Sequence, residues 1–134
     1  MKKINTFCII DDDDIYQFTT SHLLKKTELV NKIIVFSNGL KAINFLKEEI
    51  DNIENIPDIL FLDVNMPVMD GWEFLEEYLL IKPMIPKTVA IYMVSSSVDE
   101  KDVLKAKSFS VLSGYLVKPI SSKNIMEVIL ETLN

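Results

Sequence analysis

Five short apolar runs alternate along the chain with segments whose apolar residues recur at helical spacing. The runs are residues 7–10 (FCII), 33–36 (IIVF), 59–62 (ILFL), 89–94 (VAIYMV) and 115–117 (YLV). Uninterrupted runs of this length are typical of buried strands. Helical spacing occurs through Leu40, Ile43, Leu46 and Ile50 and again through Ile125, Ile129 and Leu133. This alternation predicts an α/β fold, with a doubly wound five-stranded parallel sheet and helices on both faces.

Reactive side chains follow four of these runs, at the carboxyl ends where open parallel sheets bind ligands. The residues are Asp11 to Asp14 after the first run, Asp63 after the third, Ser95 after the fourth and Lys118 after the fifth. The carboxyl ends of parallel strands meet at one edge of the sheet. We therefore expect carboxylates, a hydroxyl and an amine to face one another there.

The four consecutive aspartates, Asp11 to Asp14, concentrate negative charge at the end of the first strand. Two carboxylates about 4 Å apart repel by roughly 4 kcal/mol at an effective dielectric constant near 20. Either these acids fan out into water and cap the following helix, or a cation lies among them. A calcium loop fits poorly, since DDDDIYQFTTSH lacks the glycine and glutamate that such a loop requires. We expect Asp14 to be the helix cap, because aspartate is favoured at that position.

Composition narrows the class of protein. The 134 residues, 49% of them hydrophobic, suffice for one domain, which we place at residues 1–134. The formal net charge is −6 and all 14 basic residues are lysine, which disfavours nucleic-acid binding. No apolar run approaches the roughly 18 residues of a membrane span, and no signal-peptide cleavage site follows the first run. The single Cys8 excludes an internal disulfide, so we expect a cytoplasmic location.

A phosphoryl-transfer site is one chemical interpretation of the polar edge. If the first and third strands are neighbours, their ends lie about 5 Å apart, and Asp12 and Asp63 can share one hard cation. Mg²⁺ fits best, because it needs few carboxylates and keeps several waters. Ser95 offers a hydrogen-bond donor to an anionic ligand, and Lys118 offers a positive charge on a long stem. Such groups neutralise a transferring phosphoryl group, with a carboxylate as the nucleophile.

The chain resembles the receiver domains of two-component response regulators, in particular stand-alone receivers like the chemotaxis regulator. The resemblance is carried by IIDDD at residues 9–13, FLDVNMPVMDGWEFL at 61–75, MVSSS at 93–97 and GYLVKPI at 114–120. These motifs follow the family's order and spacing. The resemblance implies a flavodoxin-like sheet with strand order 2-1-3-4-5. One departure is KSFSVLSGY, which replaces the small Gly-Ala turn common before the fifth strand and makes that loop bulkier.

The resemblance also implies roles for individual residues. Asp63 would accept a phosphoryl group whose oxygens are bound by Ser95 and Lys118. Ser95 and Tyr115 would form the switch that responds to phosphorylation. A cis peptide bond between Lys118 and Pro119 would direct the amine into the site.

The implied metal site consists of four residues. Asp12 would bind Mg²⁺ directly, Asp11 would assist through water, and Asp63 would be the central ligand. Asn65 would contribute its backbone carbonyl. Mg²⁺ is accordingly the cofactor that we expect.

The phosphoryl donor implied by the family is a sensor histidine kinase or a histidine phosphotransfer protein. The output would be a contact with an unknown downstream protein, and a homodimer through the fourth helix, fifth strand and fifth helix is a further option. The chain would thus be a phosphoacceptor switch and not an enzyme. The alternative is a small Mg²⁺-dependent phosphatase, because IIDDD also fits haloacid-dehalogenase-like enzymes, with Asp11 as nucleophile and Asp13 as acid.

Overall fold

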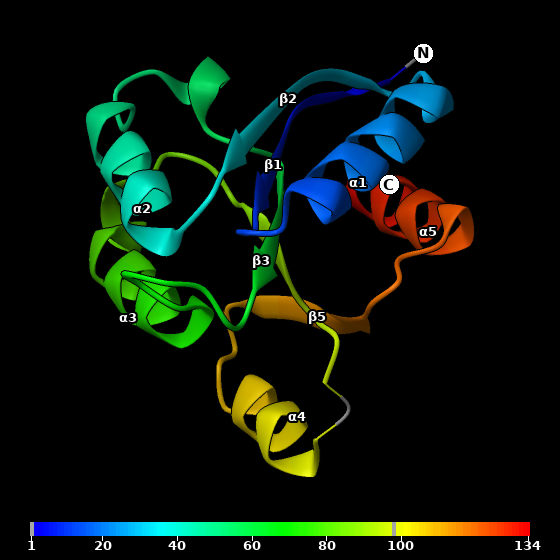
Figure 1. Ribbon diagram of the computed structural model, residues 1–134. Coiled ribbons are helices and arrows are strands. Elements are labelled where there is room, and N and C mark those ends of the chain that lie inside the picture. Colours follow the sequence, from blue (N-terminus) through cyan, green and yellow to red (C-terminus); the bar gives the residue numbers. More distant parts are fainter. Residues whose placement is uncertain (1, 98) are drawn as a thin grey trace.

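The structure, a computed structural model, describes residues 2–97 and 99–134 and has the predicted α/β architecture (Figure 1). The strands are β1 (Ile4–Ile10), β2 (Val30–Phe36), β3 (Ile59–Asp63), β4 (Ala90–Ser95) and β5 (Leu112–Val117). The helices are α1 (Asp14–Thr27), α2 (Gly39–Glu48), α3 (Gly71–Ile81), α4 (Glu100–Lys107) and α5 (Ser122–Leu133), with 3₁₀ turns at Ile53–Asn55 and Lys82–Met84. Among the described residues, no helix is long and apolar enough to cross a membrane.

All five strands are parallel and lie in the order β2-β1-β3-β4-β5, as the resemblance implied. β1 and β3 are neighbours in the sheet, with Cys8 beside Leu60. Every residue of β3 is buried. The ends of these two strands therefore lie side by side, which is the condition for a site shared by Asp12 and Asp63.

Three strands begin before the apolar runs from which they were predicted. β1 begins at Ile4, β2 at Val30 and β5 at Leu112. The sheet order makes β2 and β5 edge strands, and polar residues such as the exposed Ser113 occur within them. Uninterrupted apolar runs therefore mark only part of such a strand, because polar residues interrupt the rest of it.

Different helices cover the two faces of the sheet (Figure 1). Leu24 of α1 and Ile129 of α5 belong to the core on one face. Leu46 of α2, Phe74 of α3 and Ala106 of α4 belong to the core on the other. This arrangement confirms the predicted doubly wound fold, and it leaves the loops after the strands to form the polar edge.

Helix α1 is capped by Asp13, so our prediction that Asp14 would cap it is wrong. Asp13 has an extended backbone (φ −89°, ψ 110°), and its side chain accepts hydrogen bonds from the amides of Ile15 and Tyr16. Asp14 is the first helical residue, where its charge is favourable in the first turn. In a run of four aspartates, residue type does not distinguish adjacent capping positions.

Gly71 brings the start of α3 directly against the end of β3. Its amide donates a hydrogen bond to the Val64 carbonyl over 2.8 Å. A Cβ atom at this position would lie 2.4 Å from the Asp63 carbonyl oxygen, which is too close for any side chain. The preceding Asp70 forms a capping box with Glu73. The backbone at Asp63 and the start of α3 are therefore fixed together.

The short helix α4 is held against α3 by an aromatic contact. Trp72 of α3 is buried and stacks on Phe109, with ring centroids 5.9 Å apart and an interplanar angle of 21°. The Lys105 ammonium of α4 lies 4.9 Å from the centroid of the Trp72 ring. Phe109 belongs to the bulky KSFSVLSGY segment, so this departure from the family pattern joins α4 to α3.

Replacing Gly71 by alanine is expected to lower the free energy of unfolding by about 1–3 kcal/mol, because the backbone must move to admit a methyl group. Gly114→Ala is the matched control, since its Cβ would meet only the Tyr92 ring, at 3.2 Å, and a smaller loss is expected. Urea denaturation followed by circular dichroism measures both. A loss in Gly71→Ala no larger than that in the control would contradict this close approach.

Candidate functional site

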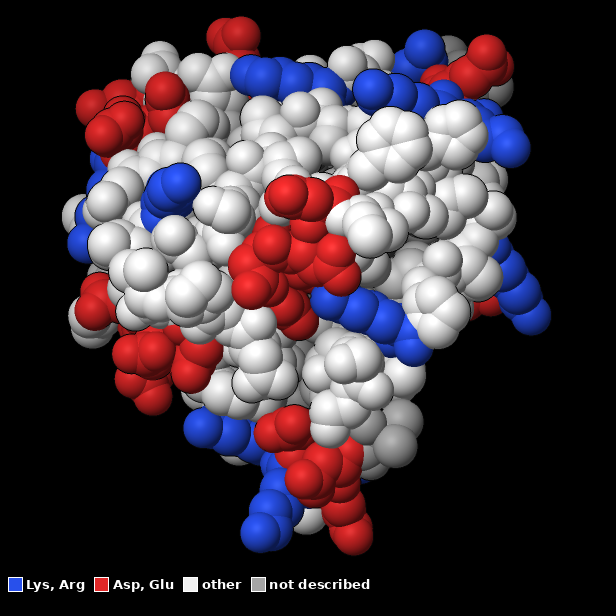
Figure 2. Space-filling view, in the orientation of Figure 1, with Lys and Arg blue, Asp and Glu red and all other residues white. Residues whose placement is uncertain are grey.

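The residues predicted to form one site converge at the carboxyl edge of the sheet. Asp11 follows β1, Asp63 ends β3, Ser95 ends β4, and Lys118 follows β5. The Lys118 Nζ lies 2.7 Å from Asp11 Oδ2 and 3.5 Å from Asp63 Oδ1. The peptide bond between Lys118 and Pro119 is cis, as the resemblance implied. In Figure 2, acidic side chains gather at the centre of the visible face, with a basic side chain beside them.

Three carboxylates can supply oxygen ligands to one cation. Ligand atoms of Asp11, Asp12 and Asp63 all lie within 4.8 Å of one another. Asp11 and Asp63 are buried, whereas Asp12 is exposed. A set of oxygen donors that opens to solvent on one side suits Mg²⁺, which retains several waters. These residues therefore fit the ion that the sequence predicted.

The acidic run divides into two halves with different surroundings. Asp11 and Asp12 lie close to Asp63. Asp13 and Asp14 are exposed and form the N terminus of α1. The run thus combines two members of a carboxylate cluster that could hold a metal ion with a pair at the start of α1.

Asn65 lies in the loop between β3 and α3 and is exposed. Its role as a carbonyl ligand stays a prediction. The same holds for the distinction between direct metal binding by Asp12 and water-mediated binding by Asp11.

Burial and mutual repulsion shift the pKa values of the buried groups. Burial, followed by the charge of Asp11, raises the pKa of Asp63 to about 6, although the Lys118 ammonium opposes the shift. Burial also raises the pKa of Asp11, against the contact with Lys118. Burial lowers the pKa of Lys118, but its contacts with the two carboxylates outweigh burial and raise it. Asp11 Oδ2 accepts no hydrogen bond of regular geometry, so its 2.7 Å contact with Lys118 is an ion pair.

Ser95 and Tyr115, the predicted switch residues, are linked through the loop after β4. The buried Ser95 hydroxyl accepts a hydrogen bond of 3.0 Å from the Ser97 amide. The Tyr115 hydroxyl donates a hydrogen bond of 3.0 Å to the Ser97 carbonyl. A single residue of the loop thus connects the two side chains.

Two residues of α1 that the sequence did not indicate also belong to the site. The Tyr16 ring faces Lys118, whose Nζ lies 4.3 Å from the ring centroid. The Gln17 side-chain amide donates a hydrogen bond to the Asp11 carbonyl. The signal that could have found them is their position, because the first turn of α1 directly follows the acidic strand end.

Comparisons with known proteins identify the family. The family model for the response regulator receiver domain matches residues 7–130. The chain is 26% identical over 123 residues to the response regulator Rcp1 of Synechocystis, covering 90% of this chain and 81% of Rcp1. It is 31% identical over 122 residues to the transcriptional regulatory protein LnrK of Bacillus subtilis, covering 91% of this chain and 50% of LnrK. A crystal structure of a two-component response regulator from Cytophaga hutchinsonii matches over 99% of each chain, with TM-score 0.88 and 30% identity.

The chain therefore belongs to the response regulator receiver family of two-component systems. Receivers bind Mg²⁺ at an acidic pocket and interact with histidine kinases or histidine phosphotransfer proteins. The cluster of Asp11, Asp12 and Asp63 is such an acidic group. Because this chain spans only 50% of LnrK, the activity of that whole protein does not carry over to it.

The substitution Asp63→Asn is expected to stabilise the metal-free protein at pH 7 by about 2–3 kcal/mol, since the native pKa of about 6 exceeds the ordinary value of 3.8. A raised pKa means that ionisation costs stability above pH 6. The advantage of the asparagine variant should therefore shrink as the pH falls through 6 and disappear near 4.

Urea denaturation at several pH values in the presence of a chelator measures this difference. Asp51→Asn, at an exposed position, is the control and should show no comparable advantage at pH 7. If Asp63→Asn is no more stable than the wild type at pH 7, the carboxylate does not carry the electrostatic cost described above.

Proposed function

We propose that this chain is a phosphorylation-dependent switch in a phosphorelay, in which Asp63 accepts a phosphoryl group from a phosphohistidine. The observation that carries this proposal is the position of one ammonium, that of Lys118, beside both Asp11 and Asp63 where three carboxylates meet. A phosphoryl-transfer site acts mainly by holding the transferred group and neutralising its charge. Mg²⁺, held by Asp11, Asp12 and Asp63, would supply further neutralisation when bound.

One oxygen of Asp63 is available to attack phosphorus. Oδ1 accepts a hydrogen bond of 3.0 Å from the Val64 amide and lies near Lys118, whereas Oδ2 has neither a hydrogen bond nor an ion pair among the described residues. Attack by Oδ2 forms an O–P bond while the P–N bond of the phosphohistidine breaks, and its electron pair leaves with the imidazole nitrogen. With a pKa of about 6, Asp63 is mostly ionised at neutral pH and able to react. The product is an acyl phosphate.

Lys118 and Ser95 are the residues that would hold the phosphoryl oxygens. The Lys118 Nζ already lies 3.5 Å from Asp63. The Ser95 hydroxyl accepts from the Ser97 amide, which leaves its own hydrogen free to be donated to a phosphoryl oxygen. A hydrogen bond to a charged acceptor contributes roughly 1.5–3 kcal/mol, enough to move the loop after β4.

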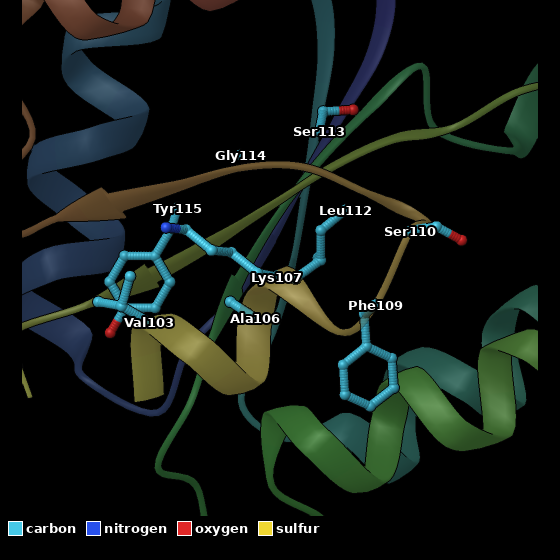
Figure 3. A pocket seen from close by; sticks show the side chains of 9 residues that line it. All are labelled: Val103, Ala106, Lys107, Phe109, Ser110, Leu112, Ser113, Gly114 and Tyr115. Atoms are coloured by element: carbon cyan, nitrogen blue, oxygen red, sulfur yellow. The ribbon is translucent and has the colours of Figure 1, made fainter. Parts of the chain in front are cut away.

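The signal would leave the site through Ser97 and Tyr115, toward the surface formed by α4, β5 and α5. The Tyr115 hydroxyl donates a hydrogen bond to the Ser97 carbonyl, so a displacement of the loop would also move the Tyr115 ring. The ring lines a pocket of about 340 Å³ between α4 and β5, together with Val103 and Phe109 (Figure 3). We propose this surface as the contact for the downstream protein, or for a second copy of the chain.

This proposal makes the chain a phosphoacceptor and not an enzyme that acts on a separate substrate. A phosphatase with Asp11 as nucleophile would need a free oxygen on that side chain. Its Oδ1 accepts a hydrogen bond of 2.9 Å from the Asp13 amide, and its Oδ2 is paired with Lys118. Asp13, the acid of that alternative, caps α1. Asp63 is therefore the favoured nucleophile.

Incubation with acetyl phosphate and Mg²⁺ is expected to add one phosphoryl group, on Asp63. Asp63→Asn should abolish the modification, because the amide offers no carboxylate oxygen for an acyl phosphate. Borohydride reduction followed by mass spectrometry locates the modified residue. The exposed Asp51→Asn variant is the control and should be labelled like the wild type. Modification trapped on Asp11 would support the phosphatase in place of the receiver mechanism.

Two exposed apolar side chains next to the site offer a surface for the phosphodonor protein. Ile15 and Phe18 of α1 are 78% and 75% exposed. They are three residues apart and so lie on one face of the helix. Both residues lie in the first two turns of α1, directly after Asp13. The Asp13 amide donates a hydrogen bond to Asp11, so this face lies next to the site. We propose that the histidine kinase or histidine phosphotransfer protein contacts this face.

Ile15→Ser and Phe18→Ser are each expected to slow phosphotransfer from the protein donor by about tenfold, the effect of losing one buried apolar contact. Phosphorylation by acetyl phosphate should not change, because that donor needs no docking surface. The donor to use is the histidine kinase of the same genome that phosphorylates the wild type fastest. Leu80→Ser, at a position 72% exposed in α3, is the control. Equal slowing with both donors would contradict a docking role.

A further inference from the structure

We propose that Tyr16 is a positioning residue for the phosphorylation of Asp63: the face of its ring holds the Lys118 ammonium beside the two carboxylates. The inference rests on the proposed function and extends it to a residue outside the motifs that define the family resemblance. It is drawn from the contacts of Lys118 and from the burial of the tyrosine.

Three side chains of the described residues lie close to the Lys118 ammonium. Its Nζ lies 2.7 Å from Asp11 Oδ2, 3.5 Å from Asp63 Oδ1 and 4.3 Å from the centroid of the Tyr16 ring. A cation within about 6 Å of a ring centroid is attracted by the negative ring face. The Lys118 side chain is only 18% exposed, so water screens this attraction weakly. The ring is thus the third contact of the ammonium, and the only uncharged one of the three.

The ring, and not the hydroxyl, makes this contact. The Tyr16 hydroxyl is buried and has no hydrogen-bond partner of regular geometry among the described residues, although Thr20 lies nearby. Removing the hydroxyl therefore breaks no hydrogen bond of regular geometry. Phenylalanine should replace tyrosine at this position, whereas leucine should not, because leucine has no ring face.

The position of Tyr16 is fixed by the start of α1. Its amide donates a hydrogen bond of 3.3 Å to the Asp13 side chain, and the Asp13 amide donates one of 2.9 Å to Asp11 Oδ1. Its ring packs against the core between the sheet and helices α1 and α5. The ring therefore stands at a constant place relative to Asp11.

Lys118 needs such a contact because its ammonium must shift from Asp11 toward Asp63 when Asp63 is phosphorylated. In this structure Lys118 lies closer to Asp11 than to Asp63, by 2.7 Å against 3.5 Å. To bind a phosphoryl oxygen on Asp63, it must move toward that residue. A ring face attracts a cation without the directional demands of a hydrogen bond, so Lys118 can move while it keeps this contact. Without the ring, its flexible stem gains conformations directed into solvent.

The test compares three variants in phosphorylation by acetyl phosphate with Mg²⁺. Tyr16→Leu is expected to react about 3- to 30-fold more slowly, the range of a partly desolvated cation–π contact. Tyr16→Phe should react within about twofold of the wild type. Phe45→Leu removes a ring of α2 that packs on Phe36 of β2. It controls for a general loss of aromatic packing and should react normally. Slowing in Tyr16→Phe equal to that in Tyr16→Leu would overturn the inference.

A double-mutant cycle separates positioning of Lys118 from a general effect on the fold. In a Lys118→Met background the ring has no cation to hold, so adding Tyr16→Leu should leave the residual rate unchanged. The same slowing in both backgrounds would show that Tyr16 does not act through Lys118. If Tyr16→Leu does not fold, as judged by circular dichroism, Tyr16→Met takes its place with the same expected outcomes.

A spectroscopic signature completes the test. A ring over the ammonium shifts the NMR resonances of the Lys118 ε-methylene protons upfield, and this shift should persist in Tyr16→Phe and disappear in Tyr16→Leu. Resonances that do not differ between these variants would contradict the contact. Absence of any phosphorylation of wild-type Asp63 would overturn the proposed function itself. Normal phosphorylation of both the wild type and Tyr16→Leu would overturn only this inference.

Discussion

The repulsion among three carboxylates that one ammonium only partly neutralises is the constraint on which the site depends. Asp11, Asp12 and Asp63 bring ligand atoms within 4.8 Å of one another, and Lys118 contacts two of the three. Two such charges about 4 Å apart repel by roughly 4 kcal/mol at an effective dielectric constant near 20. Burial and, after it, this excess charge raise the pKa of Asp63. The same excess suits the site to a divalent cation, and it underlies the response to a phosphoryl group that we propose.

The fold keeps the carboxylates together against this repulsion by rigid backbone contacts. Asp63 ends the fully buried strand β3, and the close approach of Gly71 leaves its backbone no room to move. Two hydrogen bonds join Asp11 to the start of α1. Its side chain accepts one from the Asp13 amide, and its backbone carbonyl accepts one from the Gln17 side chain. The stability of the core therefore offsets the electrostatic cost of the site, as is usual for functional sites.

The sequence predicted those parts of the molecule that depend on local residue pattern. Strand β3 was located to within one residue, because a strand buried on both faces is an unbroken apolar run. The start of β5 was missed, since an edge strand admits polar residues such as Ser113. The helix cap was placed one residue too late, at Asp14. Strand order came from family resemblance, and the contact of Tyr16 with Lys118 arises only when distant segments pack together.

The stacking of Trp72 on Phe109 gives the molecule an intrinsic optical probe. Trp72 is the only tryptophan of the chain, so fluorescence excited at the red edge of protein absorption comes from this residue alone. Trp72 follows Gly71, which lies against the backbone of Asp63. Its indole contacts Lys105 of α4 and Phe109, which comes just after α4. Any displacement of α4 relative to α3 would therefore change the surroundings of this indole. Rapid-mixing fluorescence can therefore follow such a displacement on the unlabelled protein.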